Sequence, residues 1–201
     1  MTQPTMTIPL VDMQGVRERD PQSLARAGAA IRRACTEVGF FYIVNHGLPQ
    51  TAIDDAMQAA RAFFAEPLER KTEVAVNKRH RGFHRRGGAT MYQATRPDEK
   101  EFYSFGLDLA EDDPSVLAGE ALRGPNQWPS FMPEFQRAMD RYFLEVGRCG
   151  ADLLRAAAGD FTGSAGKAAK GVLRSALGEL LGERPLRSRQ LFLRRRERQD
   201  G

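Results

Sequence analysis

Three histidines are the residues of this 201-residue chain whose chemistry suits metal binding or proton transfer: His46, His80 and His84. His80 and His84 are four residues apart, so their side chains would share a face of either a helix or a strand. Gly82 lies between them and argues against a helix. A zinc or iron site needs at least a third protein ligand, and no carboxylate or thiol stands close to this pair. We therefore predict no metal site here.

The third histidine belongs to the tripeptide Asn45-His46-Gly47, which follows the apolar run from Phe40 to Val44. One interpretation makes His46 a metal ligand. The other makes the tripeptide a structural turn, in which the imidazole bonds nearby backbone and fixes the exit from a strand. The residue types alone leave both interpretations open.

Two further clusters have simple structural explanations. Glu111-Asp112-Asp113 could hold a cation, but it directly precedes Pro114, and capping of a helix N-terminus explains it sufficiently. Trp128 could stack on a ligand, but Pro125 and Pro129 flank it, which favours a rigid loop packed on the core. The irregular, basic segment 75–98 is typical of a solvated loop.

The first part of the chain shows alternating strand and helix signals. Asp20-Pro21 is a helix start, Gly39 is a helix stop, and the continuous apolar run between Gly39 and Asn45 predicts a strand buried on both faces. The predicted elements in this part are a strand at Ile8–Asp12, a helix from Pro21 to Val38, a strand at Phe40–Val44, a helix after Pro49, and a short helix from Pro67 to about Val74.

The second part predicts fewer strands and one long helix. The expected elements are short strands at 82–84 and 102–106, a turn or short helix after Asp113, and a helix from about Pro133 to about Ala158. Beyond residue 158 the chain becomes small, polar and basic, with one further amphipathic helix expected at 167–181. We therefore predict a domain at 1–158 and a divergent tail at 159–201 that is disordered or read out of frame.

Charge is concentrated in that tail. Residues 159–201 contain 10 Lys and Arg against 5 Asp and Glu, a balance of +5. Residues 1–158 contain 20 against 21, a balance of −1, and together these give the net charge of +4. Nucleic-acid binding would rest on the tail alone, and Arg194–Arg198 lacks the interleaved aromatic residues of single-strand binders. A charged, disordered end is the simpler prediction.

Composition favours a cytoplasmic protein with an apolar core. The apolar fraction is 41%, yet no apolar run approaches the about 20 residues needed to cross a bilayer, and residues 1–9 lack signal-peptide features. We predict no membrane association. Cys35 and Cys149 fall on apolar helix faces and are expected to be buried, reduced thiols.

Six segments, in order, resemble the N-terminal region of the non-haem iron, 2-oxoglutarate-dependent dioxygenases of the isopenicillin N synthase-like family. The resemblance is nearest to bacterial isopenicillin N synthase family oxygenases and ethylene- or succinate-forming enzymes, and it covers roughly residues 7–158. The segments are Ile8–Asp12, Gly39–Gly47, Ala62–Phe64 with Pro67–Lys71, Arg81–Phe83, Pro97–Glu101 with Phe105-Gly106, and Gly124–Pro129.

The resemblance implies an α+β fold, in which this region contributes helices and strands to a jelly-roll barrel. It implies iron(II) held by a His-x-Asp pair and a later His, 2-oxoglutarate held by an Arg-x-Ser pair, and a small-molecule substrate. It also implies structural roles for Gly39, Asn45, His46 and Gly47. By the same resemblance, the segment lining the mouth of the active site supplies candidate substrate contacts, which are Arg81, Phe83, His84 and Arg85.

The chain departs from the family pattern at the iron ligands. The residues two positions after its histidines are Leu48, Gly82 and Arg86, so no His-x-Asp occurs, and residues 159–201 contain no histidine and no Arg-x-Ser. We therefore expect an incomplete barrel, and a truncated chain that binds neither cofactor and is not catalytically competent. Two alternatives remain: a binding module completed by a separately encoded C-terminal half, and a non-catalytic protein with a nucleic-acid-binding tail.

Overall fold

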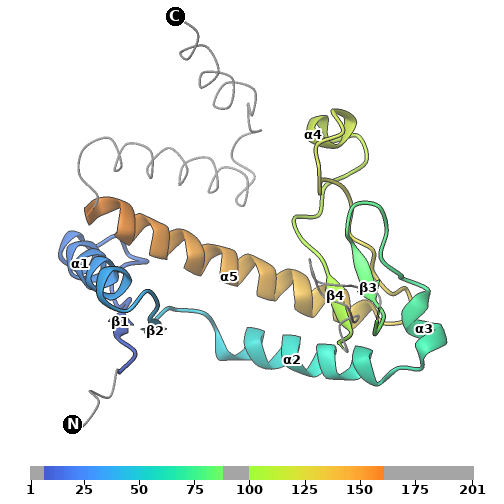
Figure 1. Cartoon of the computed structure of the whole chain (residues 1–201), viewed down its shortest axis with the longest axis horizontal. Coiled ribbons are helices and arrows are strands. Elements are labelled where there is room, and N and C mark those ends of the chain that lie inside the picture. Colours follow the sequence, from blue (N-terminus) through green and yellow to red (C-terminus); the bar gives the residue numbers. More distant parts are fainter. Residues whose placement is uncertain (1–6, 88–99, 161–201) are drawn as a thin grey trace, which may run out of the picture. The chain divides into compact units, whose positions relative to one another are not determined.

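Residues 7–87 and 100–160 are described by a computed structural model (Figure 1). Their contacts divide them into two units: residues 7–47 with 146–160 form unit 1, and residues 48–145, apart from the gap, form unit 2. Within these ranges, no helix is both long and apolar enough to cross a membrane. The predicted helix at 167–181 and the basic tail lie outside the described residues.

Helix α1 (Pro21–Glu37) begins and ends where the sequence predicts. The Asp20 carboxylate accepts a hydrogen bond of 2.8 Å from the backbone N–H of Ser23, and Pro21 occupies the first turn. At the other end, Gly39 has φ +96°, a left-handed conformation that favours glycine. The expected burial of Cys35 is wrong, because this thiol lies on the exposed side of α1, whereas Cys149 is half-buried. Both thiols are free.

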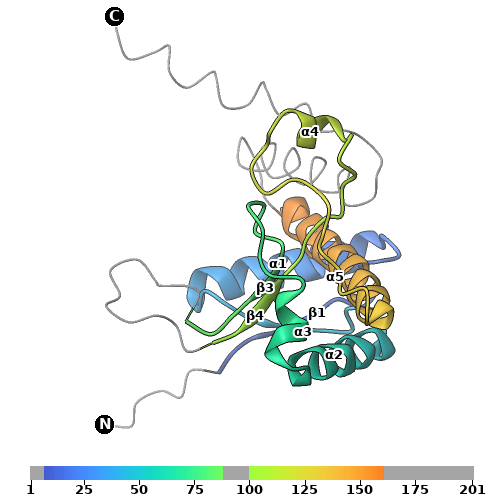
Figure 2. The ribbon, with the colours of Figure 1, turned by 90° about the vertical axis from the view of Figure 1, so that its right-hand side faces the viewer.

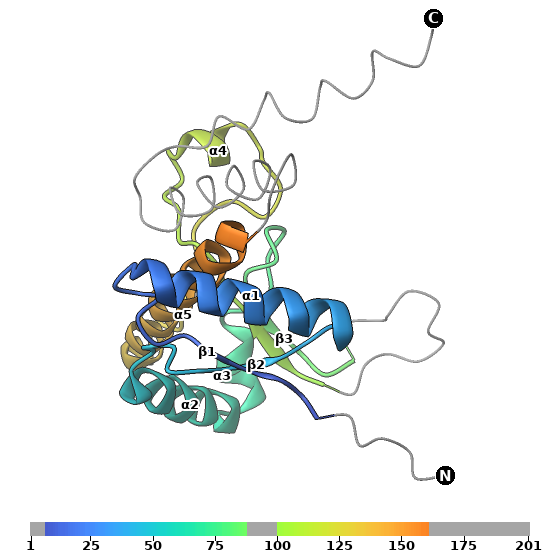
Figure 3. The same ribbon diagram turned by 90° about the vertical axis from the view of Figure 1, so that its left-hand side faces the viewer.

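Strands β1 (Leu10–Asp12) and β2 (Tyr42–Val44) pair in parallel, with Val11 opposite Ile43. Figure 3 shows α1 running alongside both strands. One face of the strand pair packs with α1 and with the C-terminal half of α5 (Pro133–Asp160). The apolar side chains of this core are Val11, Met13, Val16, Ala27, Ile31 and Ala156, with Ile43 packed against them.

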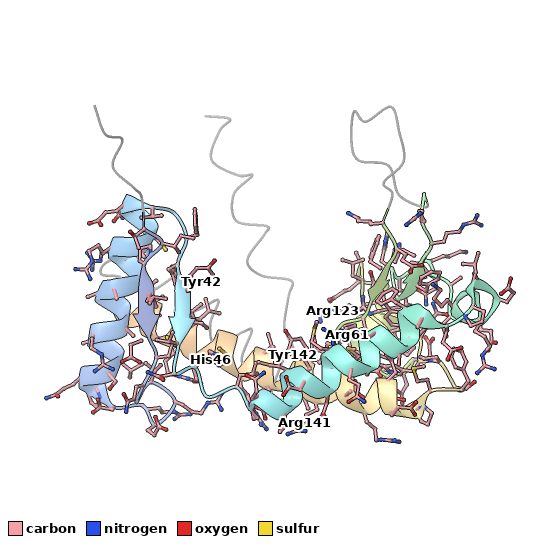
Figure 4. The ribbon with its side chains drawn as sticks, turned by 90° about the horizontal axis from the view of Figure 1, so that it is seen from below. Tyr42, His46, Arg61, Arg123, Arg141 and Tyr142 are labelled. Atoms are coloured by element: carbon pink, nitrogen blue, oxygen red, sulfur yellow. The ribbon has the colours of Figure 1, made fainter. Side chains whose placement is uncertain are left out.

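The other face of the strand pair is open, so the prediction of a strand buried on both faces is wrong for the described residues. Leu10, Phe40 and Tyr42 are 66%, 53% and 60% exposed. Val44 is also exposed. Figure 4 shows Tyr42 on the side of β2 away from α1. The physical reason is the alternation of side chains along a strand: the helical cover reaches Val11 and Ile43 but not their neighbours.

Unit 2 contains the remaining elements, close to their predicted positions. Figure 2 shows the ribbon of β3 and β4 with α3 and α2. The elements are α2 (Gln50–Ala65), α3 (Leu68–Thr72), β3 (Gly82–His84), β4 (Phe102–Ser104), α4 (Pro114–Leu117) and the N-terminal half of α5. Strands β3 and β4 are antiparallel, with Phe83 opposite Tyr103 and His84 opposite Phe102. The described residues thus form two separate two-stranded sheets rather than a closed barrel.

Phe63 lies at the centre of the core of unit 2. Its side chain is fully buried, and its ring centroid is 6.0 Å from that of Phe83, 5.1 Å from that of Tyr103 and 4.9 Å from that of Phe135. These three rings come from β3, β4 and α5. One side chain of α2 therefore packs against β3, β4 and α5.

We expect Phe63→Ala to lower the free energy of unfolding by about 3–5 kcal/mol, because it removes buried area and leaves a cavity among rings that cannot easily collapse. Urea unfolding of the full chain, followed by Trp128 fluorescence, measures this change. Met57→Ala on the exposed side of α2 is the matched control and should change the free energy of unfolding by less than about 0.5 kcal/mol. Equal effects of the two substitutions would contradict the central role of Phe63.

Candidate functional site

The segment 81–85 contains the predicted substrate contacts, and the structure divides them into two pairs. Arg81 and Phe83 are only 9% and 1% exposed, so a solvated basic loop is wrong for these two residues. Phe83 is buried because its ring packs against Phe63 of α2, and it pairs with Tyr103 across the ribbon. His84 is half-buried and Arg85 is exposed, and these two residues therefore remain candidates for ligand contact.

Arg81 supports a neighbouring loop. Its Nη2 donates a hydrogen bond of 2.8 Å to the carbonyl oxygen of Leu122, and a Cβ at Gly106 would lie 2.8 Å from the same nitrogen. Its Nε is buried and has no hydrogen-bond partner within the described residues. Burial is the main cause that lowers the pKa of this guanidinium, which still stays charged near neutral pH. We assign Arg81 to packing of the loop against β3.

His84 is held in a defined orientation by β4. Its ring stacks on Phe102 with centroids 3.9 Å apart and planes 12° apart, and its Nε2 lies 3.1 Å from Ser104 Oγ. Burial lowers the pKa of the imidazole, and the positive charge of nearby His80 lowers it further. A neutral ring at neutral pH follows, with one nitrogen as donor and the other as acceptor.

The two histidines do not form a metal site. His80 is exposed and has φ +56° in the turn before β3, so it does not share a strand face with His84. Across residues 7–87 and 100–160, no three His, Cys, Asp or Glu side chains gather in a way that could hold a metal ion. The donor groups of the described residues therefore do not fit iron(II).

An ion pair between a buried lysine and a solvent-accessible glutamate anchors the start of β4. Lys71 Nζ lies 2.9 Å and 3.2 Å from the two carboxylate oxygens of Glu101, and it donates a further bond of 3.2 Å to the carbonyl of Phe64. The Lys71 side chain is buried, so the Glu101 carboxylate compensates a charge that is costly to leave unpaired. The sequence provides no signal for this pair, because its members are 30 residues apart.

The Asn45-His46-Gly47 tripeptide forms the turn after β2. Asn45 and Gly47 adopt positive φ values of 54° and 67°, and Asn45 Nδ2 donates to Asp12 Oδ1 over 2.8 Å. Arg17 donates from one terminal nitrogen to the Gly47 carbonyl over 2.9 Å and from Nε to Asp152 over 3.2 Å. This geometry supports a structural role for Asn45 and Gly47, while the role of the half-buried His46 ring stays a prediction.

The other two clusters have the predicted structural roles. Asp113 caps α4 by accepting from the backbone N–H of Ser115 over 2.8 Å. Trp128 packs against Tyr103, Phe105 and Phe135, and its indole N–H donates to Asp108 over 3.1 Å. Sequence reasoning missed that Glu111, next to this cap, forms a bidentate ion pair: its two carboxylate oxygens accept hydrogen bonds of 2.7 Å and 2.8 Å from the terminal nitrogens of Arg79.

The lowered pKa of His84 predicts how stability depends on pH. Because the folded state favours the neutral ring, the unfolded state binds a proton more readily, and stability decreases as pH falls through about 6.5. In an NMR titration we expect the His84 midpoint below about 6.5, and Phe102→Ala should move it upward by exposing the ring. Leu117→Ala, at an exposed site of α4, should leave it unchanged. A wild-type midpoint at or above that of Phe102→Ala would contradict this prediction.

Comparison with known protein families finds a match to the family model described as non-haem dioxygenase in morphine synthesis N-terminal, over residues 8–131. A 2-oxoglutarate-dependent dioxygenase of Aspergillus niger, caaD, is 34% identical over 155 residues, which are 75% of this chain and 47% of the relative. Azadirone synthase LFS of Melia azedarach is 34% identical over 123 residues, or 60% of this chain and 36% of the relative. The chain thus spans less than half the length of these relatives.

Solved structures show the same relationship. A Caulobacter crescentus protein described as a member of the 2OG-Fe(II) oxygenase family superimposes with a TM-score of 0.64 at 27% identity, over 78% of this chain and 49% of that protein. Neurospora crassa T7H, crystallised with alpha-KG and thymine, superimposes with a TM-score of 0.59 at 25% identity, over 79% and 49%. Since the family model matches more than half of the chain, the protein belongs to the non-haem, 2-oxoglutarate-dependent dioxygenases and corresponds to their N-terminal region.

Proposed function

We propose that this chain is the N-terminal part of an oxygenase that uses iron(II), 2-oxoglutarate and dioxygen to oxidise a small molecule. The observation that carries the proposal is the match over residues 8–131 to a non-haem dioxygenase family model. The names of the relatives agree with it, since they include 2-oxoglutarate-dependent dioxygenases and a plant synthase. Neurospora crassa T7H, which was crystallised with alpha-KG and thymine, also binds small molecules.

The cofactor-binding residues belong, on this proposal, to a second half that the 201 residues do not supply. None of the three histidines is followed two positions later by Asp, and the donor groups of the described residues do not fit iron(II). The chain alone would then neither bind iron(II) and 2-oxoglutarate nor turn them over. Its own contribution is the ribbon of β3 and β4, whose exposed end presents His84 and Arg85 to substrate, with Phe83 and Arg81 packed behind.

Anaerobic addition of iron(II) and 2-oxoglutarate tests this division of roles. From this chain alone we expect no visible charge-transfer band and no succinate after oxygen is admitted, because the ligand set is incomplete. A band or succinate from this chain alone would contradict the proposal that the cofactor-binding residues lie in a second half.

The coding sequence immediately downstream supplies the other arm of the test. Read in all frames, it should contain His-x-Asp, a distal His and Arg-x-Ser, and joining it to this chain should produce both the band and succinate. A locus without these motifs, or a joined protein that is folded yet inactive with both cofactors, would contradict the oxygenase proposal.

A second candidate function, a binding module completed by a separately encoded C-terminal half, is favoured by one observation. The outer face of β1 and β2 presents Leu10, Tyr42 and Val44 to solvent, with Phe40 next to them. Exposed apolar patches of this kind mark interaction surfaces, and a two-stranded sheet also leaves unpaired strand edges. The occupant proposed here is the second half of the family fold.

We expect Leu10→Ser with Tyr42→Ser to weaken co-purification of this chain with that second half by at least about tenfold, because both substitutions remove apolar area from the contact. Met57→Ser, also at an exposed apolar position but in unit 2, is the control and should leave the yield of complex unchanged. Equal yields for all three chains would rule out this face as the docking surface.

A further inference from the structure

Residues 107–123, which we call the flap, leave the core of unit 2 and return to it at nearly the same place. There the Asn126 side chain accepts a hydrogen bond of 3.0 Å from the Gly106 N–H and donates one of 2.8 Å to the Gly106 carbonyl. Within the flap, α4 buries none of its residues, and Leu117 is 73% exposed. Figure 1 shows α4 at the end of the flap farthest from β3 and β4. Apolar packing therefore does little to hold the flap in place.

Arg81 joins the outgoing limb of the flap (106–111) to its returning limb (122–126). Its Nη2 donates a hydrogen bond of 2.8 Å to the carbonyl of Leu122 on the returning limb. On the outgoing limb, a Cβ at Gly106 would lie 2.8 Å from the same nitrogen, so the guanidinium packs directly on that glycine. Because Arg81 is buried, salt and water have little access to this bridge.

Arg79 forms a second bridge between the same limbs. Its two terminal nitrogens donate to the carboxylate of Glu111, and a Cβ at Gly124 would lie 2.5 Å from its Cδ. The Arg79 and Glu111 side chains are 35% and 66% exposed. An ion pair this exposed is screened by salt and contributes little to stability, so it can break while the Arg81 bridge holds.

Both arginines extend from one fixed turn that leads into β3. Asn77 Oδ1 accepts from the backbone N–H of Arg79 over 2.9 Å and from that of Arg81 over 3.1 Å. Between the two bridges, the limbs share a backbone hydrogen bond of 3.4 Å from Leu109 to Gly124, which is longer than a typical bond of this kind. The outgoing limb is thus held firmly at its base and weakly farther out.

We propose that the flap is hinged, with Arg81 as its anchor and the Arg79–Glu111 ion pair as its latch. Release of Glu111 lets the outgoing limb part from Gly124 and breaks the bond from Leu109, while the base of the flap stays closed. Anions that compete for Arg79 favour the open form. Opening of this kind goes beyond the proposed oxygenase function and requires none of its cofactors.

Hydrogen exchange of the full chain, followed by NMR, tests the hinge through the protection factor of the Leu109 amide. At about 0.05 M salt, Glu111→Gln should lower this protection factor by about two- to fivefold, because the amide is exposed whenever the limbs part. Raising NaCl to about 1 M should lower it similarly in wild type but change it little further in Glu111→Gln, since both remove the same contact. The Gly106 amide should keep its protection, because the anchor holds the base of the flap.

Asp55→Asn is the matched control. It breaks another exposed ion pair of unit 2, in which Arg141 lies 2.8 Å from Asp55, and should leave the exchange of Leu109 unchanged. Since Asp55 and Glu111 are both exposed, neither substitution should disturb folding, and the amide spectrum verifies this.

Three outcomes would overturn the hinge. They are equal protection of Leu109 in Glu111→Gln and wild type, a salt effect as large in Glu111→Gln as in wild type, and an equal loss of protection at Leu109 and Gly106, which would indicate melting of the whole loop. The measurement needs no iron, 2-oxoglutarate or turnover, so its failure would leave the oxygenase proposal standing. An inactive joined protein would likewise leave a positive exchange result intact.

Discussion

The packing of Phe63 is the interaction on which the candidate site depends. Two strands of three residues each are too short to be stable alone, so the ribbon needs a surface to pack on. Phe63 supplies that surface through Phe83 on one strand and Tyr103 on the other. Because side chains alternate along a strand, burial of these two rings directs His84 and Phe102 to the opposite face. The core thus determines which residues of the ribbon can meet a ligand.

At the ribbon of β3 and β4, Lys71 has a carboxylate partner, whereas Arg85 has none within the described residues. Lys71 is buried, so its ammonium needs a carboxylate partner, and Glu101 provides one at the start of β4. That pairing uses the acidic group nearest to Arg85 in the register. Within the described residues, the exposed Arg85 therefore has no carboxylate partner at this end of the ribbon.

Local signals in the sequence predicted the elements well and their partners poorly. Asp20, Pro21 and Gly39 determine the ends of α1 through short-range capping, and such effects can be seen in a single sequence. Pairs such as Arg17 with Asp152, separated by 135 positions, depend on the tertiary fold and leave no local pattern. The segment 81–85 stays a predicted ligand contact, and only the structure separates its buried Phe83 from its exposed Arg85.

The error about β2 is informative because the prediction placed the strand correctly and failed only on its second face. A continuous apolar run is typical of parallel strands covered on both faces, and β1 and β2 do pair in parallel. The described residues cover one face with α1 and part of α5, and leave Tyr42 and Leu10 exposed on the other. Retaining large apolar side chains in water has no folding benefit within this unit. On the proposed docking of a second half of the family fold, that half would cover them; this chain spans 47% of its Aspergillus relative.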